Sequence, residues 1–237
     1  MAVSFLSARW SNLILLTYAV PPELLQHRLP DELELDARDG RAFVSLVAFD
    51  FLDTRVLGVA WPGYRNFPEV NLRFYVHRRD SGERGVMFIR EFVPQRLVAW
   101  VARRIYNEPY QAAPMRSRVE MHGGTIVIEH EFTAGGRVNS IRAIGELATS
   151  CPADTSDEHF FKEHRWGFGR ARRGGRCIIY EVIHPTWECH AVREWKLDLE
   201  WGSVYGQEWA ILQDAKPCSV VIAKGSRVSV LPKRSID

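Results

Sequence analysis

Lysine is scarce in this chain. Its 237 residues include only five lysines, and none of them lies in the first 161 residues, although that stretch is rich in arginine. Arginine makes forked contacts with carboxylates and phosphates, but it cannot serve as an imine-forming amine. Two thirds of the chain therefore contain no side-chain amine that could form a Schiff base. The five lysines are Lys162, Lys196, Lys216, Lys224 and Lys233.

Other absences narrow the protein class. The four cysteines include no pair at the two-residue spacing of zinc or redox motifs. The start of the chain shows no secretory leader, and no apolar run approaches the ~20 residues of a membrane span. We therefore expect a reduced, cytoplasmic protein with free thiols and no membrane association.

Cofactor motifs are also missing. The chain contains no glycine-rich dinucleotide fingerprint, no phosphate loop and no nucleophile elbow. His184, Glu188, Cys189 and His190 lie close in sequence, but their spacing fits no zinc signature. The sequence therefore predicts neither a metal nor an organic cofactor.

The distribution of strand patterns predicts the fold class. About ten short β-rich segments are separated by glycine turns, and only two or three segments have helical patterns. We expect a mainly β fold, a closed or nearly closed antiparallel barrel formed by residues 1–237 as a single domain. The best helix is Gln95–Tyr106. Hairpins are predicted for 33–36 with 41–51, for 70–77 with 86–92, and for 219–223 with 227–231.

One strand carries the first candidate site. With a two-residue period, Glu69, Asn71, Arg73 and Tyr75 share one face, and the alternating apolar residues share the other. The polar face could simply be solvated, as half-buried strands often are. If it lines a barrel interior instead, Glu69 could act as an acid or base and Arg73 could hold a carboxylate.

Two histidines and a tryptophan form further candidates. His164 ends a predicted helix, where a protonated imidazole would interact favourably with the negative end of the helix dipole. His184 precedes a proline, which holds it extended, and Trp187 follows three residues later. Both histidines could transfer protons near neutral pH, or could be structural hydrogen-bond donors. Trp187 could close one end of a cavity or lock the last strands onto the barrel.

A basic hairpin is the remaining feature. It could contact RNA or phosphates, or form a solvated turn. The net charge of +2 gives no reason to expect a nucleic-acid partner. The basic residues of this hairpin are Arg165, Arg170, Arg172, Arg173 and Arg176.

Six blocks of the chain carry a family resemblance. They are Trp10–Pro30, Leu33–Asp36, Gly40–Val47, Phe67–Val76, His164–Gly169 and His184–Trp187. Together they resemble the bacterial domain-of-unknown-function family 2071 (DUF2071), which is similar to the acetoacetate decarboxylase superfamily. The resemblance covers nearly the whole chain. It implies an acetoacetate-decarboxylase-like β-barrel with one central cavity and short helices outside.

The resemblance also assigns site residues. Glu69 matches an active-site glutamate of the decarboxylases, and a second such glutamate falls at Ser45. The segment 103–111, which includes Arg104, resembles their catalytic segment, where two lysines follow the proline. Here Tyr110 and Gln111 follow Pro109. The resemblance thus implies the scaffold without its imine chemistry.

These observations lead to one leading hypothesis and two alternatives. We expect a cavity that binds a small, anionic organic molecule, with Glu69, Arg73 and His184 as candidate catalytic residues in a lyase or isomerase-like reaction. The alternatives are a non-catalytic ligand-binding or regulatory protein on the same fold, and an RNA- or protein-interaction module that uses the arginine hairpin. A homo-oligomer is left open. The expected ligand-binding residues are Ser45, Asn71, Tyr75, Arg104, Tyr110, Gln111, His164 and Trp187.

Overall fold

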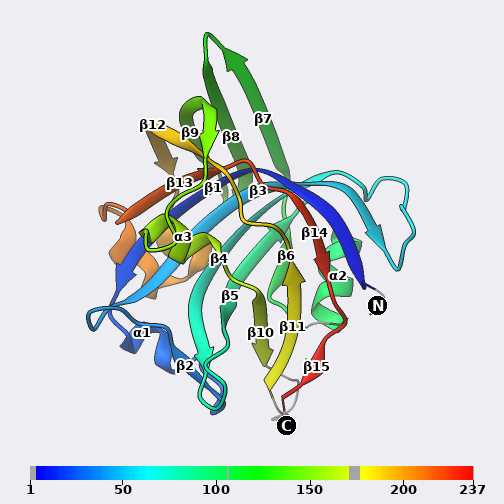
Figure 1. Ribbon diagram of the computed structural model, residues 1–237, viewed down its shortest axis with the longest axis vertical. Helices are drawn as coiled ribbons and strands as arrows, with labels where there is room; N and C mark the ends of the chain where they lie inside the picture. Colours follow the sequence, from blue (N-terminus) through cyan, green and yellow to red (C-terminus); the bar gives the residue numbers. More distant parts are fainter. Residues whose placement is uncertain (1–3, 106, 171–176, 237) are drawn as a thin grey trace.

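A closed barrel of seven strands forms the centre of the molecule (Figure 1). The computed structural model describes residues 4–105, 107–170 and 177–236. The barrel closes because the last of its strands, β14, pairs with the first, β1. Its strands are β1 (Leu6–Val20), β3 (Ala42–Val56), β4 (Phe67–Arg78), β5 (Arg84–Val93), β10 (Trp166–Arg170), β11 (Cys177–Ile183) and β14 (Arg227–Val230).

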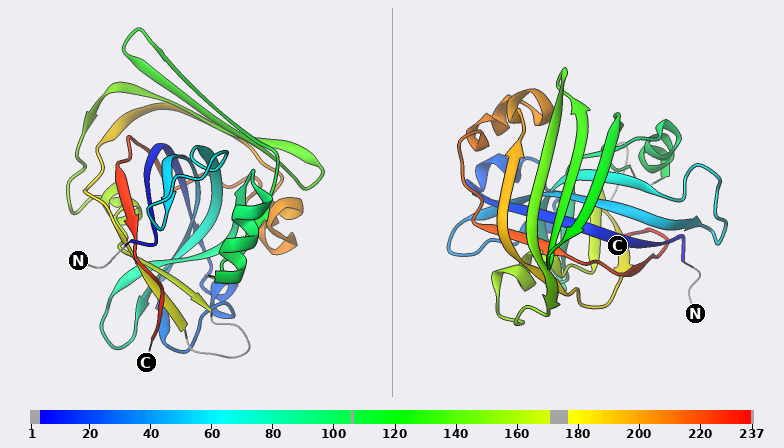
Figure 2. Two further views of the ribbon diagram at one scale, coloured as in Figure 1. Left: turned by 90° about the vertical axis from the view of Figure 1, so that its right-hand side faces the viewer. Right: turned by 90° about the horizontal axis from the view of Figure 1, so that it is seen from above.

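A second group of strands continues from β1 and covers one side of the barrel (Figure 2). The β7–β8 hairpin extends well beyond the body of the molecule (Figure 1). This layer consists of β13 (Ser219–Ala223), β12 (Cys189–Asp198), β9 (Arg137–Ser150), β8 (Thr125–Ala134) and β7 (Met115–His122). Within this layer, β7, β8 and β9 form a meander of consecutive antiparallel strands.

The two-residue period of the shared strands creates two separate cores. On β1, Leu13 and Leu15 point into the barrel, whereas Ile14 and Leu16 belong to the core beneath the second layer. The same alternation on β4 places Val70 in that outer core. The shared strands therefore separate the barrel interior from the outer core. Because the outward-facing side chains already form the outer core, inward-facing positions can carry polar residues.

The remaining elements are short. The predicted helix of 95–106 is confirmed as α2, within the described residues. The remaining elements are α1 (Glu23–Gln26), β2 (Leu33–Leu35), α2 (Arg96–Ile105), β6 (Tyr110–Ala112), α3 (Asp157–Lys162), α4 (Trp201–Tyr205), the 3₁₀ helix η1 (Gln207–Leu212) and β15 (Arg234–Ser235).

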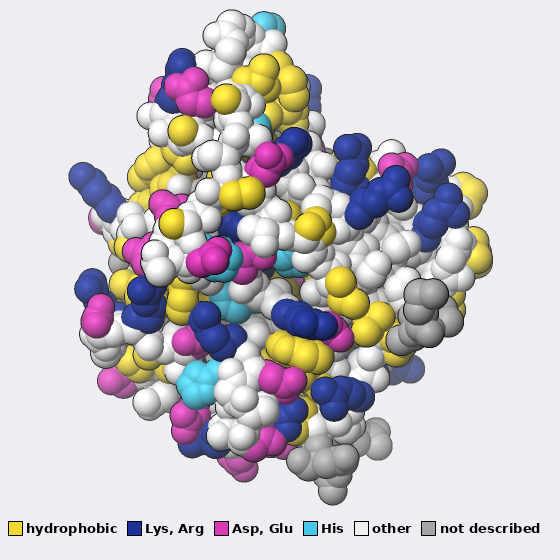
Figure 3. Space-filling model, in the orientation of Figure 1, with side chains coloured by type: hydrophobic (Ala, Val, Ile, Leu, Met, Phe, Trp, Pro, Cys, Tyr) yellow, Lys and Arg dark blue, Asp and Glu magenta, His cyan; other side chains and the backbone are white. Residues whose placement is uncertain are grey.

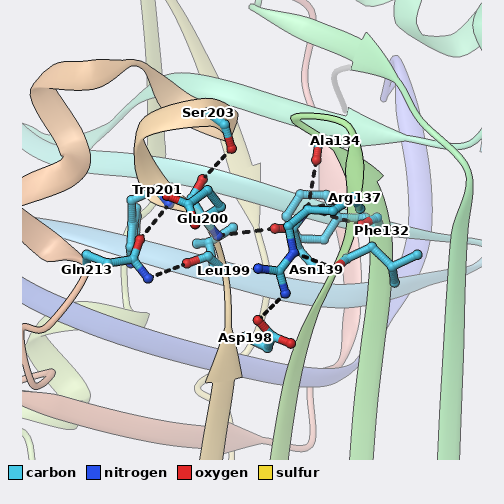
Figure 4. Close-up of polar contacts among 11 residues, drawn as sticks. Phe132, Ala134, Arg137, Asn139, Asp198, Leu199, Glu200, Trp201, Ser203 and Gln213 are labelled. Atoms are coloured by element: carbon cyan, nitrogen blue, oxygen red, sulfur yellow. Dashed lines mark hydrogen bonds and ion pairs between the residues drawn. The ribbon is translucent and has the colours of Figure 1, made fainter.

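Side-chain amides fix α4 against the second layer (Figure 4). Asn139 accepts a hydrogen bond from the Glu200 backbone N–H and donates to the Ala134 carbonyl. Gln213 accepts from the Trp201 N–H and donates to the Leu199 carbonyl. Because the first N–H groups of a helix lack intrahelical partners, these contacts stabilise its start.

Two predicted hairpins are wrong in their pairing. β2 pairs with β4 instead of with β3. β13 and β14 do not pair with each other but lie one after the other along β1. At the join, a Cβ on Gly225 would lie 2.1 Å from the Trp10 carbonyl oxygen, so the segment that links β13 to β14 passes the β1 backbone too closely for any other residue.

The surface charges are mostly mixed in sign. On the face shown in Figure 3, acidic and basic side chains are interspersed, and a group of Lys and Arg side chains lies over the β3–β4 loop. Of the basic hairpin, Arg172, Arg173 and Arg176 lie outside the described residues. Arg165 is ion-paired with Glu181. None of the helices in the described part of the chain has the length and apolar character that a membrane span needs.

Candidate functional site: a carboxyl-lined cavity in the barrel

The barrel interior contains a cavity of about 460 Å³. One part of its wall is polar and is formed by residues of β4, β5, β6 and β11, of the segment before β6, and of α3 and the segment that follows it. β1, β3 and α2 supply much of the apolar lining. The polar lining residues are Glu69, Asn71, Arg73, Glu91, Glu108, Tyr110, Lys162, His164, Tyr180 and His184.

Three glutamates form a buried cluster in this wall. Glu69, Glu91 and Glu108 are each at most 5% exposed. Tyr110 donates a hydrogen bond to Glu69 Oε2 at 2.9 Å, and Asn71 donates to Glu69 Oε1 at 3.0 Å. Glu91 lies beside Tyr110 because β5 and β6 pair in parallel.

The third glutamate is held by β11, which only β10 separates from β5 in the barrel. Tyr180 of β11 donates a hydrogen bond to Glu108 Oε1 at 3.0 Å. The ring of Tyr180 crosses β10 at Gly167, where a Cβ would lie 2.2 Å from the ring. Glycine at this position is therefore what allows Tyr180 to reach the cluster.

Burial makes these carboxyls weak acids. It raises the pKa of Glu69 to about 7, against the lowering effects of Asn71, Tyr110 and Arg73. It raises the pKa of Glu108 to about 8, against the Tyr180 hydrogen bond. The pKa of Glu91 rises well above its usual value, first by burial and then by the charges of Glu69 and Glu108. Near neutral pH the cluster therefore holds protons that it can donate.

A cationic group lies further along the same face of β4. Arg73 donates from Nη2 to the Phe161 carbonyl at 2.9 Å, and this contact connects β4 to α3. His164 is buried nearby, and burial, followed by the charge of Arg73, holds its pKa well below the usual range. His164 is therefore neutral at pH 7. Lys162 is buried and ion-paired with Glu163.

Several buried polar atoms in this wall have no hydrogen-bond partner among the described residues. They are Asn71 Oδ1, Arg73 Nε, Glu91 Oε1 and both ring nitrogens of His164. All four residues line the cavity. Because buried polar groups are nearly always paired, such a concentration in one wall indicates a surface built to contact a ligand or water.

The structure brings most of the predicted site residues to one cavity. Those in its lining are Glu69, Asn71, Arg73, Tyr110, His164, His184 and Trp187. Glu69 is 2% exposed, which agrees with the inward face expected from the strand period.

Four predicted residues lie outside the lining. Ser45 and Tyr75 are buried and hydrogen-bonded to each other, and Tyr75 also donates to the Phe161 carbonyl. Gln111 is exposed on β6, and Arg104 is exposed on α2. The structure thus separates Gln111 from its neighbour Tyr110, which points inward.

Sequence reasoning missed Glu91, Glu108, Tyr180 and Lys162. A signal exists for Glu91, since a carboxylate in the apolar strand 84–93 is unusual unless it has a function or a partner. Among the described residues, no group of three or more His, Cys, Asp or Glu side chains is arranged to hold a metal ion.

Comparisons with known proteins agree with this architecture. The profile of DUF2071, described as an uncharacterized conserved protein, matches residues 7–227. The uncharacterized protein YqjF of Bacillus subtilis is 35% identical over 119 residues, which are 49% of this chain and 47% of that protein. This chain thus spans about half the length of that relative.

Solved structures of the acetoacetate decarboxylase type show the same fold. The acetoacetate decarboxylase of Legionella pneumophila matches with a TM-score of 0.62 at 14% identity, over 98% of this chain and 87% of that one. An acetoacetate decarboxylase-like enzyme from Sphingomonas wittichii matches with a TM-score of 0.66 at 11% identity, over 99% of this chain and 94% of that one. The enduracididine biosynthesis enzyme MppR, complexed with pyruvate, matches with a TM-score of 0.65 at 13% identity, over 100% of this chain and 92% of that one.

Proposed function

The chain belongs to the DUF2071 family, and we propose that, in the bacterial cytoplasm, its barrel cavity binds a small anionic organic molecule. The observation that carries this proposal is the position of Glu69. It is buried in the cavity wall between the hydrogen-bond donors Tyr110 and Asn71, and Arg73 lies four residues further along the same strand face. This arrangement combines a proton donor with a cation in one cavity.

Arg73 and His164 are the proposed anion-binding pair. A guanidinium can hold a carboxylate through forked, charge-assisted hydrogen bonds, and Arg73 Nε has no partner among the described residues. The neutral imidazole of His164 adds one N–H donor. The pyruvate complex of the fold neighbour MppR supports the choice of small carboxylates as probes.

Glu69 is the proposed acid or base. With a pKa of about 7, its two protonation states are nearly equally populated at neutral pH, which is the most effective condition for proton transfer. Non-covalent acid–base chemistry on a carbonyl or carboxylate compound, of lyase or isomerase type, follows from this. A non-catalytic binding protein would use the same wall, so turnover separates the two functions.

Ligand binding should depend on Arg73. We expect isothermal titration with pyruvate and acetoacetate to show binding that Arg73→Gln weakens by about tenfold or more, since a hydrogen bond to a charged group contributes about 1.5–3 kcal/mol. Arg116→Gln is the matched control, because Arg116 is exposed on β7, away from the cavity. Equal affinities for the parent chain and Arg73→Gln would contradict the proposed anion site.

Turnover should depend on Glu69. If the protein is an enzyme, it should exchange the α-protons of a bound carbonyl compound for deuterium, and Glu69→Gln should abolish that exchange while the ligand still binds. Proton NMR measures both. Binding without any exchange in the parent chain would support the non-catalytic alternative.

No Schiff base should form. Borohydride reduction in the presence of acetoacetate or pyruvate is expected to add no mass to the native protein. Tyr110 and Gln111 carry no amine, and the Nζ of Lys162, which lines the cavity, is ion-paired with the Glu163 carboxylate. A lysine held in an ion pair is not free to attack a carbonyl carbon. A stoichiometric adduct in intact-mass spectra, absent from Lys162→Arg, would show that this lysine reacts and would contradict the prediction.

A further inference from the structure

We propose that the ligand of this cavity is an amphiphile, with a carboxylate or carbonyl head and an apolar chain or ring system as its body. The inference rests on the proposed function, because it places the head at Arg73, His164 and the carboxyl cluster. It adds the class of the rest of the molecule. The body would lie along β1 and β3 and extend to an opening between the β3–β4 loop and α2.

The inner walls of β1 and β3 are apolar where they line the cavity. Leu13 and Leu15 of β1 and Val47, Phe49 and Phe51 of β3 all line the cavity. In the β3–β4 pairing, Val47 lies beside Asn71 and Phe49 lies beside Glu69. The polar wall and the apolar wall are thus adjacent, so one elongated molecule can contact both.

The apolar wall continues to the surface. Trp61 of the β3–β4 loop and Leu97 of α2 line the cavity, yet they are 56% and 50% exposed. Such residues mark an opening to solvent. Val98 and Val101 of α2 line the cavity behind them. Figure 1 shows α2 and this loop on the same side of the barrel.

The cavity is larger than a short polar acid needs. A volume of about 460 Å³ falls within the ~300–1,000 Å³ range of pockets for drug-sized ligands. A molecule of the size of pyruvate would contact only the polar wall. An amphiphile would also cover the apolar wall, and the burial of apolar surface provides most of the binding free energy in such pockets.

The test is a chain-length series. Butanoate, hexanoate, octanoate and decanoate, each below its micelle concentration, are titrated into the full chain by calorimetry. We expect affinity to rise by about fourfold per added methylene, which is the value for burial of a CH₂ group. Arg73→Gln should weaken all four acids by a similar factor, since each presents the same head.

Variants at the opening test where the chain lies. Trp61→Gln combined with Leu97→Gln should weaken decanoate by about tenfold and leave butanoate unchanged. The matched control is Met121→Gln with Val138→Gln, because these side chains are 60% and 56% exposed and lie outside the lining. The control should bind all four acids like the parent chain.

The two hypotheses fail in different ways. Affinity that is independent of chain length but lost in Arg73→Gln would overturn the amphiphile inference and leave the proposed anion site standing. A steep chain-length dependence that Arg73→Gln does not alter would refute the anion site, and with it the placement of the head. A loss of decanoate affinity in the Met121/Val138 control equal to that in the Trp61/Leu97 variant would overturn the proposed path of the chain.

Discussion

A Trp187→Ala protein is expected to unfold with a free energy about 3–5 kcal/mol below that of the parent chain, as large-to-small core substitutions do. Trp187 is 2% exposed and packs in the core cluster inside the barrel. Its indole donates a hydrogen bond to Ser226 Oγ at 2.8 Å, and its backbone N–H donates to Glu163. One residue thus joins the segment after β11 to α3 and to the turn that precedes β14.

His184→Ala should cost less stability. Its ring stacks on Trp187 with centroids 4.4 Å apart, but it is only partly buried. If the pair locks the last strands onto the barrel, His184→Ala leaves ligand affinity unchanged. If His184 instead contacts the ligand, the same variant keeps its melting temperature and binds more weakly.

Chemical denaturation and ligand titration of the two single variants separate these roles. Trp100→Ala is the matched control for stability, since Trp100 is 53% exposed on α2. A Trp187→Ala protein as stable as this control would contradict the locking role.

The parts of the site that sequence could predict are those fixed by local geometry. The two-residue period of 67–78 requires Glu69, Asn71 and Arg73 to share one face of the strand. The many glycine-bounded strands predict a barrel, in which that face lies opposite the inner faces of other strands. The inward position of Tyr110, by contrast, depends on the parallel pairing of β6 with β5. No local pattern reports such a pairing.

The rest of the site depends on contacts between distant segments. Glu108 becomes part of the cluster through Tyr180, which is 72 residues away in sequence. The same limit explains the wrong hairpins. The hairpin predicted for 219–223 with 227–231 is wrong because β13 and β14 run one after the other along β1, so the chain does not reverse at Gly225. A glycine between two strands is a local signal, whereas the choice of partner strand is not.

The carboxyl cluster should make the protein less stable as the pH rises from 6.5 to 8. Glu69 and Glu108 have pKa values of about 7 and about 8 in the folded chain. Above the usual carboxyl pKa, the unfolded chain has released protons that the folded chain retains. Stability falls with pH wherever the folded state binds more protons, until the pH exceeds the folded pKa. The loss over this window is on the order of 3 kcal/mol.

Histidines contribute little over this window. Burial lowers the pKa of His164 and of His130 in the folded chain. A histidine of this kind reduces stability mainly below the usual pKa of about 6.5, because the unfolded chain progressively loses its histidine protons above that pH. Between pH 6.5 and 8, the buried carboxyls therefore dominate the slope.

Denaturant unfolding at pH 6.5, 7.25 and 8 measures the effect. Glu108→Gln should remove the contribution of one proton, about 1.4 kcal/mol per pH unit, because glutamine keeps the acceptor for Tyr180 but cannot ionise. At pH 8 this variant should be more stable than the parent chain. Glu120→Gln, exposed on β7, should keep the parent slope. A stability that stays constant or increases between pH 6.5 and 8 would mean that the cluster is already ionised in the folded protein, and Glu69 would then lack the proton that its proposed role as an acid requires.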